Sequence, residues 1–156
     1  MNIDIVAVGT RMPAWVNDAY EEYARRLVHD LKLNLVEIPI GQHGKKMDAV
    51  TAKRVEGEKM LAGISSANHV IALDVKGKSW STKKLSDQLS HWMQDGRDVS
   101  LLVGGPDGLD DSCLSRADQH WSLSALTFPH PLVRIILAEQ LYRAASILHN
   151  HPYHRG

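Results

Sequence analysis

Residues 99–108 read VSLLVGGPDG, a short aliphatic run that passes directly into a glycine-rich turn. The run Val99–Val103 is typical of a β-strand, and Gly104 and Gly105 remove the Cβ atoms that would keep a ligand away from the backbone amides. Pro106 fixes a turn. The segment is neither the dinucleotide G-x-G-x-x-G motif nor a phosphate-binding loop with its lysine. It therefore predicts a strand-to-helix turn, which either contacts a ligand or serves only the fold.

The sequence on both sides of this stretch alternates between strand and helix patterns. We expect strands at about 3–9, 34–40, 69–74, 99–103 and 120–123, and helices at about 13–31, 50–64, 82–95, 110–116 and 132–149. Within the first helix, an apolar stripe is expected at Trp15, Ala19, Tyr23, Leu27 and Leu31. The polar stretch 41–49 is expected to be a mobile loop, and Pro39 to cost the second strand a ladder hydrogen bond. Strands that alternate with helices predict an α/β fold with a mostly parallel sheet.

Ligands of such sheets bind beyond the carboxyl ends of the strands, which places interest on the segments after Asp74, Val103 and Leu123. The loop 123–131, LSALTFPHP, is apolar although loops normally face solvent. It suits the wall of a pocket for a flat aromatic group, whose edge backbone groups can recognise. The alternative is a buried connection that only packs.

The C-terminal tail 149–155, HNHPYHR, combines titratable, aromatic and cationic side chains. Its three histidines suggest zinc, but Pro152 breaks the helix that a paired ligand set needs, so we expect no metal. Tyr153 beside His154 and Arg155 suits base stacking and phosphate binding. A frayed chain end is the alternative. For Glu139 and Arg143, one helical turn apart, an intrahelical ion pair is the simplest interpretation.

The bulk composition describes a globular protein of 156 residues with 18 basic and 18 acidic side chains. This length fits a single domain, 1–156. Zero net charge is unusual for an RNA-binding protein, although nine histidines add some positive charge near neutral pH. The lone Cys113 and the lack of a signal peptide or long apolar run predict a cytoplasmic protein that is not membrane-bound. Local basic clusters can still face RNA: Lys45, Lys46, Lys53, Arg54, Lys76, Lys78, Lys83 and Lys84.

Taken together, the segments IDIVAVG, LDVKGK, LLVGGPDG, LSALTFPHPLVRIILAEQLYRAASI and NHPYHR resemble the SPOUT-class family of ribosomal RNA large subunit methyltransferases H. The resemblance extends over essentially the whole chain. It implies an α/β-knot, in which a C-terminal trefoil knot closes a parallel sheet, and a homodimer in which one subunit's tail reaches toward the other's cofactor. The implied S-adenosyl-L-methionine pocket comprises Leu73, Gly104, Gly105, Leu123, Ser124, Ala125, Leu126, Thr127 and Phe128.

The resemblance further implies methylation of N3 of a pseudouridine in helix 69 of 23S ribosomal RNA, on the assembled ribosome. The sulfonium methyl is already electrophilic, so neither a metal nor a covalent nucleophile is needed. His154 is the candidate for assisting loss of the imide proton, and Tyr153 is the candidate platform for the base. Arg143 or Arg155 would bind phosphate or stabilise developing charge.

Two other functions compete with this hypothesis. A non-catalytic knotted dimer that binds RNA or ribosomes is the main alternative, although such a protein would have no need of an intact pocket and tail. A nucleotide-dependent oxidoreductase is disfavoured, because only Gly9 follows the first strand where G-x-G-x-x-G would be required.

Overall fold

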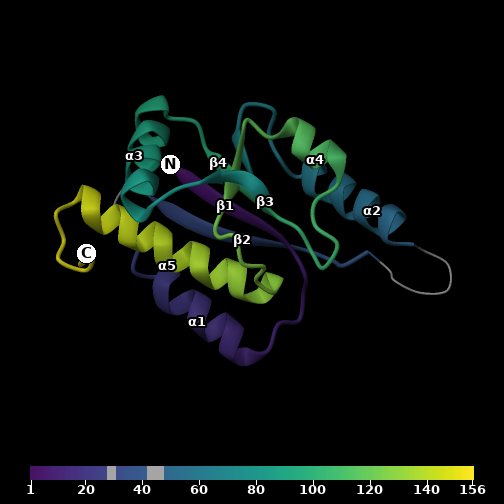
Figure 1. The fold of residues 1–156 in the computed structure, drawn as a ribbon, viewed down its shortest axis with the longest axis horizontal. Helices are drawn as coiled ribbons and strands as arrows, with labels where there is room; N and C mark the ends of the chain where they lie inside the picture. Colours follow the sequence, from purple (N-terminus) through teal and green to yellow (C-terminus); the bar gives the residue numbers. More distant parts are fainter. Residues whose placement is uncertain (28–30, 42–47) are drawn as a thin grey trace.

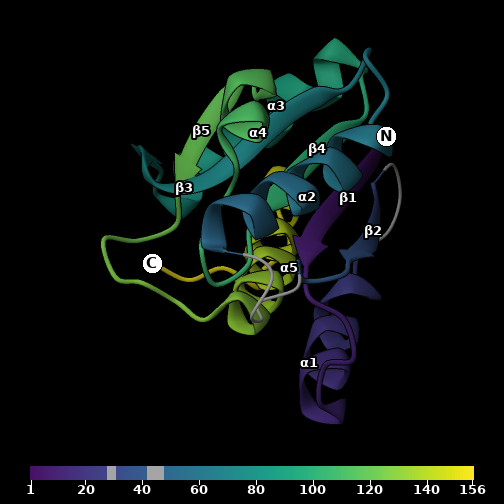
Figure 2. The ribbon, with the colours of Figure 1, turned by 90° about the vertical axis from the view of Figure 1, so that its right-hand side faces the viewer.

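The structure is a computed structural model that describes residues 1–27, 31–41 and 48–156. Within these residues, five parallel strands form one sheet in the order β2-β1-β4-β3-β5 (Figures 1 and 2). The strands are β1 (Asn2–Val8), β2 (Lys32–Ile38), β3 (His69–Ser79), β4 (Val99–Val103) and β5 (Gln119–Ser122). The helices are α1 (Ala14–Ala24), α2 (Ala49–Ala62), α3 (Thr82–Asp95), α4 (Asp111–Arg116) and α5 (His130–Leu148). The predicted α/β fold with its parallel sheet is confirmed.

The two faces of the sheet carry two separate apolar clusters. Along β1, Ile3 and Ile5 belong to the cluster under α1, α3 and α5, whereas Val6 belongs to the cluster under α2 and α4. In β4, Leu101 and Leu102 divide in the same way, because successive side chains of a strand point to opposite faces. All five residues of β4 are buried, as its central position requires.

Several predicted boundaries are wrong. The first helix ends at Ala24, so Leu27 and Leu31 are buried after the helix rather than on its stripe. Trp15 is 58% exposed, and Val16 and Tyr20 face the core instead. The four-residue spacing therefore identified the helix and the position of Tyr23, which packs partly buried against the core, but it misplaced Trp15.

Strand ends also differ from the prediction. β2 ends at Ile38, so Pro39 lies beyond the ladder and costs it no hydrogen bond. β3 continues to Ser79 and α5 begins at His130, both beyond the predicted limits. The predicted loop 41–49 lies largely outside the described residues. α3 is capped at both ends: the Ser81 side chain accepts from the Lys84 amide, and Gly96 ends the helix at φ 82°.

Candidate functional site

A cavity of about 920 Å³ lies at the carboxyl ends of β3, β4 and β5, where the topology predicted a ligand site. Three chain segments form most of its wall: the middle of β3, the glycine turn after β4, and the connection from β5 into α5. Eight of the nine predicted pocket residues line it: Leu73, Gly104, Gly105, Leu123, Ser124, Leu126, Thr127 and Phe128. Ala125 belongs to the same loop but does not line the cavity.

The glycine turn is closed on itself. The Gly108 amide donates to the Gly105 carbonyl at 3.0 Å, and Gly108 adopts φ 82°. A Cβ at Gly104 would lie 2.5 Å from the Gly108 carbonyl carbon, and one at Gly105 would lie 2.9 Å from Val8 Cγ1. The predicted turn chemistry is thus confirmed, and both glycines are required by close packing within the protein.

A bulge in β3 contributes a wall from the segment after Asp74, which the order of strands predicted as a place for a ligand although none of its residues was assigned to the pocket. Leu73 and Lys78 both pair with Trp121, so the intervening residues leave the ladder. Asp74, Val75 and Lys76 line the cavity from this bulge. Gly77 lies beyond the predicted strand 69–74 but inside β3, and a Cβ there would lie 2.6 Å from the His120 carbonyl carbon.

The loop after β5 is ordered by its own serines. Ser122 Oγ donates to the Ser124 carbonyl at 3.1 Å, and Ser124 Oγ accepts from the Leu126 amide at 3.0 Å. These bonds hold Leu126 at the cavity with 69% of its surface exposed. An exposed leucine and the neighbouring Phe128 leave an apolar wall open to a ligand.

His130 lines the cavity at the start of α5; it lies in the loop 123–131 that was predicted to form a pocket wall, but it was not among the residues assigned to the cofactor. Its Nδ1 is buried and has no hydrogen-bond partner among the residues that the structure describes. Burial, and secondarily the nearby Arg134 guanidinium, lowers the pKa of His130 below its ordinary value. The ring is therefore favoured in its neutral form at the cavity wall.

Charged residues of both signs border the cavity. Lys53 and Lys76 stand among the lining residues with Asp74, Asp107 and Asp111. Of the basic clusters predicted to face RNA, these two lysines are thus at the cavity, while Lys45 and Lys46 lie outside the described residues.

Three of the four predicted catalytic residues, Arg143, Tyr153 and His154, gather at the other end of α5. Glu139 Oε1 accepts from Arg143 Nε at 2.8 Å, Arg143 Nη2 at 2.5 Å and the Tyr153 hydroxyl at 3.1 Å. The Arg143 guanidinium carbon lies 4.7 Å from the centroid of the Tyr153 ring. The tail is thus folded back onto α5, and the expected ion pair is part of a larger cluster.

His154 joins this cluster through one ring nitrogen. Arg143 Nη1 lies 3.3 Å from His154 Nδ1. Burial, followed by the hydrogen bond to Glu139, raises the pKa of the Tyr153 hydroxyl, so the phenol stays protonated. Arg155 is exposed at the chain end.

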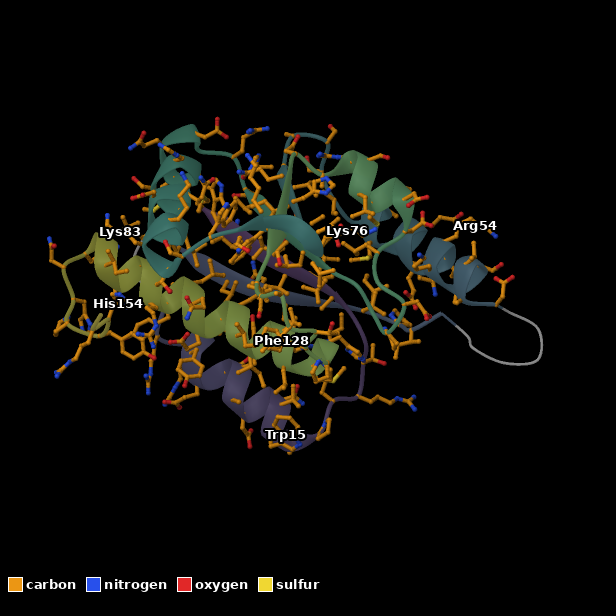
Figure 3. All side chains as sticks on the ribbon, in the orientation of Figure 1. Trp15, Arg54, Lys76, Lys83, Phe128 and His154 are labelled. Atoms are coloured by element: carbon orange, nitrogen blue, oxygen red, sulfur yellow. The ribbon has the colours of Figure 1, made fainter. Side chains whose placement is uncertain are left out.

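The cavity and the tail cluster do not meet within one chain. They lie at opposite ends of α5, as the labels of Phe128 and His154 in Figure 3 show. From His130 to Arg143 the helix rises by about 20 Å. One chain therefore does not assemble the two predicted sets of residues into one site.

Within residues 1–27, 31–41 and 48–156, no group of histidine, cysteine, aspartate and glutamate side chains is arranged to hold a metal ion. In the same described part of the chain, no helix is long and apolar enough to cross a membrane.

Comparison with known proteins gives one consistent result. The family model described as "Predicted SPOUT methyltransferase" matches residues 1–154. "Ribosomal RNA large subunit methyltransferase H" of Marinomonas sp. (strain MWYL1) is 57% identical over 155 residues, covering 99% of this chain and 100% of that protein. The protein of the same name from Hahella chejuensis is 56% identical, and the alignment covers 99% of both chains. That from Saccharophagus degradans is 57% identical, and the alignment covers 99% of this chain and 100% of that protein. This chain belongs to the SPOUT methyltransferase family.

Proposed function

We propose that this protein, as a single SPOUT domain spanning 1–156, methylates large-subunit ribosomal RNA in the cytoplasm. The finer proposal is transfer from S-adenosyl-L-methionine to N3 of a pseudouridine in helix 69 of 23S ribosomal RNA, on the assembled ribosome. The supporting observation is the cavity at the carboxyl edge of the sheet, formed by the same three segments that the family resemblance assigns to the cofactor. The names of the relatives support ribosomal RNA as the substrate class.

The residues present suit this cofactor. A cavity of about 920 Å³ is large enough for a nucleoside with an amino-acid side arm. Leu73, Leu126 and Phe128 offer apolar surface for the adenine ring, and the backbone of Gly104 can approach its edge. When bound, S-adenosyl-L-methionine supplies a sulfonium methyl group that is already electrophilic.

The tail residues would act on the target base. Tyr153 offers a ring for stacking, and Arg143 and Arg155 can bind phosphate or stabilise negative charge. The imide nitrogen loses its proton to water and would form a bond to the methyl carbon, while the electrons of the broken C–S bond stay on sulfur. The main task of the protein is to align nitrogen and methyl carbon.

We further propose that the active site is completed across a homodimer. Because the tail cluster lies about 20 Å along α5 from the cavity, the tail of one subunit would serve the cavity of the other. A two-fold dimer contains two such sites.

Methyl transfer from labelled S-adenosyl-L-methionine tests the proposal, with ribosomes that lack the modification compared with naked 23S RNA. Label on the assembled ribosome, mapped to N3 of the helix 69 pseudouridine, supports it. Label on another nucleotide overturns the finer assignment. Cofactor binding without transfer to any RNA favours the non-catalytic ribosome-binding dimer.

Mixed dimers test the shared site. Leu126→Glu places a charge at the apolar wall without disturbing the core, and His154→Ala removes a tail group. Each variant alone should be inactive. After unfolding and refolding together, random pairing should restore about a quarter of wild-type activity, since half the dimers then hold one intact site. If no activity is recovered, the cavity residues and the tail residues of the same chain act in one site.

A further inference from the structure

Glu139 is the centre of the tail cluster, although the sequence gives it only the role of an ion-pair partner. One oxygen, Oε1, accepts from two nitrogens of Arg143 and from the Tyr153 hydroxyl. The pair is partly shielded, with 16% of the Glu139 side chain and 26% of the Arg143 side chain exposed. Two hydrogen bonds from neighbouring guanidinium nitrogens to one carboxylate oxygen restrict both the position and the plane of the guanidinium.

The guanidinium in turn constrains His154. Arg143 Nη1 lies 3.3 Å from His154 Nδ1. A guanidinium carries only donors, so Nδ1 must be the acceptor in this contact. In the neutral ring the proton is then on Nε2, which is the nitrogen not engaged with Arg143.

We propose that Glu139 is a positioning residue that acts through Arg143 to hold neutral His154 in the Nε2–H tautomer, so that the tail presents a hydrogen-bond donor to the target base. The proposal rests on the proposed function for the identity of that base. It changes the role expected for His154: Nε2, the nitrogen that does not contact Arg143, donates a hydrogen bond and does not take the imide proton.

The chemistry of an imide explains how a donor can help. The ring carbonyls beside N3 gain negative charge as N3–H is lost, and an N–H donor to such an oxygen stabilises the anion. The proton passes to water, the nitrogen lone pair forms the bond to the methyl carbon, and the C–S electron pair remains on sulfur. Arg143 is the neighbour that holds the His154 ring, and Tyr153 is bound to the same Glu139 oxygen as Arg143.

The tautomer is measured directly by NMR on full-length protein labelled with ¹⁵N-histidine, without cofactor or RNA. At a pH where the ring is neutral, long-range proton–nitrogen spectra distinguish the protonated from the unprotonated nitrogen. The His154→Gln variant assigns the signal among the nine histidines. We expect Nε2 protonated and Nδ1 unprotonated in the wild type, and a growing Nδ1–H population in Glu139→Gln and in Arg143→Met.

The matched control is Glu58→Gln, which makes the same change in the exposed Arg54–Glu58 pair of α2, also four residues apart. This variant should leave the His154 spectrum unchanged. A wild-type ring protonated on Nδ1, or a Glu139→Gln spectrum identical to that of the wild type, would overturn the proposal. Circular dichroism and the unchanged signals of distant histidines show whether Glu139→Gln is folded.

A methylation assay distinguishes a hydrogen-bond donor from a general base at position 154. The amide nitrogen of glutamine reaches a position near that of histidine Nε2 and donates a hydrogen bond, but it does not accept a proton at neutral pH. We therefore expect His154→Gln to keep a kcat at least tenfold above that of His154→Ala, with KM for the ribosome little changed. Equal loss in both variants contradicts the donor role. If the wild type methylates no RNA at all, the proposed function fails while the tautomer result still stands.

Discussion

Arg134 and Glu37 are 97 residues apart in sequence, and they join α5 to the end of β2 by a hydrogen bond of 2.8 Å between Arg134 Nη1 and Glu37 Oε2. The Arg134 side chain is fully buried, and its Nη2 also donates to the Gly9 carbonyl at 3.2 Å. A buried guanidinium is tolerated only when it is paired, so this contact fixes the start of α5, and hence one wall of the cavity, relative to the sheet.

Removing the partner of Arg134 should destabilise the fold. Among the described residues, Glu37→Leu leaves the buried Arg134 cation with the Gly9 carbonyl as its one remaining partner. We expect a loss of roughly 2 to 4 kcal/mol in unfolding free energy, less than for a fully buried pair because Glu37 is 35% exposed. Urea denaturation measures this loss. Glu58→Gln, in an exposed ion pair, is the control and should change stability much less. Small and equal losses of stability in Glu37→Leu and Glu58→Gln would show that water solvates Arg134 in the Glu37→Leu variant.

The glycine turn should tolerate no side chain at its first position. Gly104→Ala places a Cβ 2.5 Å from the backbone of Gly108, so the turn must shift, and we expect S-adenosyl-L-methionine to bind at least tenfold more weakly by calorimetry. Gly63→Ala is the matched control, because its Cβ would meet nothing closer than the Met60 carbonyl oxygen at 3.9 Å. An unchanged cofactor affinity in Gly104→Ala would mean that the turn is not part of the cofactor site.

Cofactor binding and methyl transfer should respond to different residues. Arg155→Ala changes an exposed tail residue far from the cavity along α5, so cofactor affinity should stay within about twofold while turnover falls by about 100-fold. Calorimetry and a ribosome methylation assay measure the two quantities on the same preparation. A parallel loss of cofactor affinity would mean that the tail also binds the cofactor.

Acid should weaken the fold through His130. Its pKa is lowered in the folded protein by burial first and by Arg134 second, so the unfolded chain binds the proton more readily. The stability that the neutral ring contributes is present above the ordinary value of 6.5 and is lost as the pH falls through the folded-state pKa. Urea denaturation between pH 7 and 5 should therefore show a shallower decline for His130→Gln than for the wild type. Parallel declines would assign the acid sensitivity to other groups.

Cys113 should be unreactive while the protein is folded. Burial, and secondarily the nearby Asp110, raises the pKa of its thiol to about 11. The stability contributed by the neutral thiol is present below its ordinary value of 9.0 and is lost as the pH rises through about 11. A disulfide reagent at pH 8 should label the urea-unfolded chain at once and the folded protein only at the rate of unfolding. Immediate labelling of the folded protein would contradict the buried environment.

Local chemistry in the sequence determined most of the elements and the identity of the cavity loops. The run 99–103, the Ser81 and Gly96 caps and the turn at Gly104 each depend on residues close in the chain, whose conformational preferences are intrinsic. Because parallel sheets bind ligands at their carboxyl edge, the order of strands and helices along the chain was also enough to locate the cavity.

Only the tertiary structure decided what depends on contacts between distant segments. The exposure of Trp15, the β3 bulge against Trp121 and the pairing of Arg134 with Glu37 follow from packing that no local pattern encodes. The separation of the tail from the cavity likewise follows from the length of α5. The sequence supplied the groups at both ends of that helix, and the fold placed Glu139 where a single carboxylate oxygen orders Arg143 and Tyr153 together.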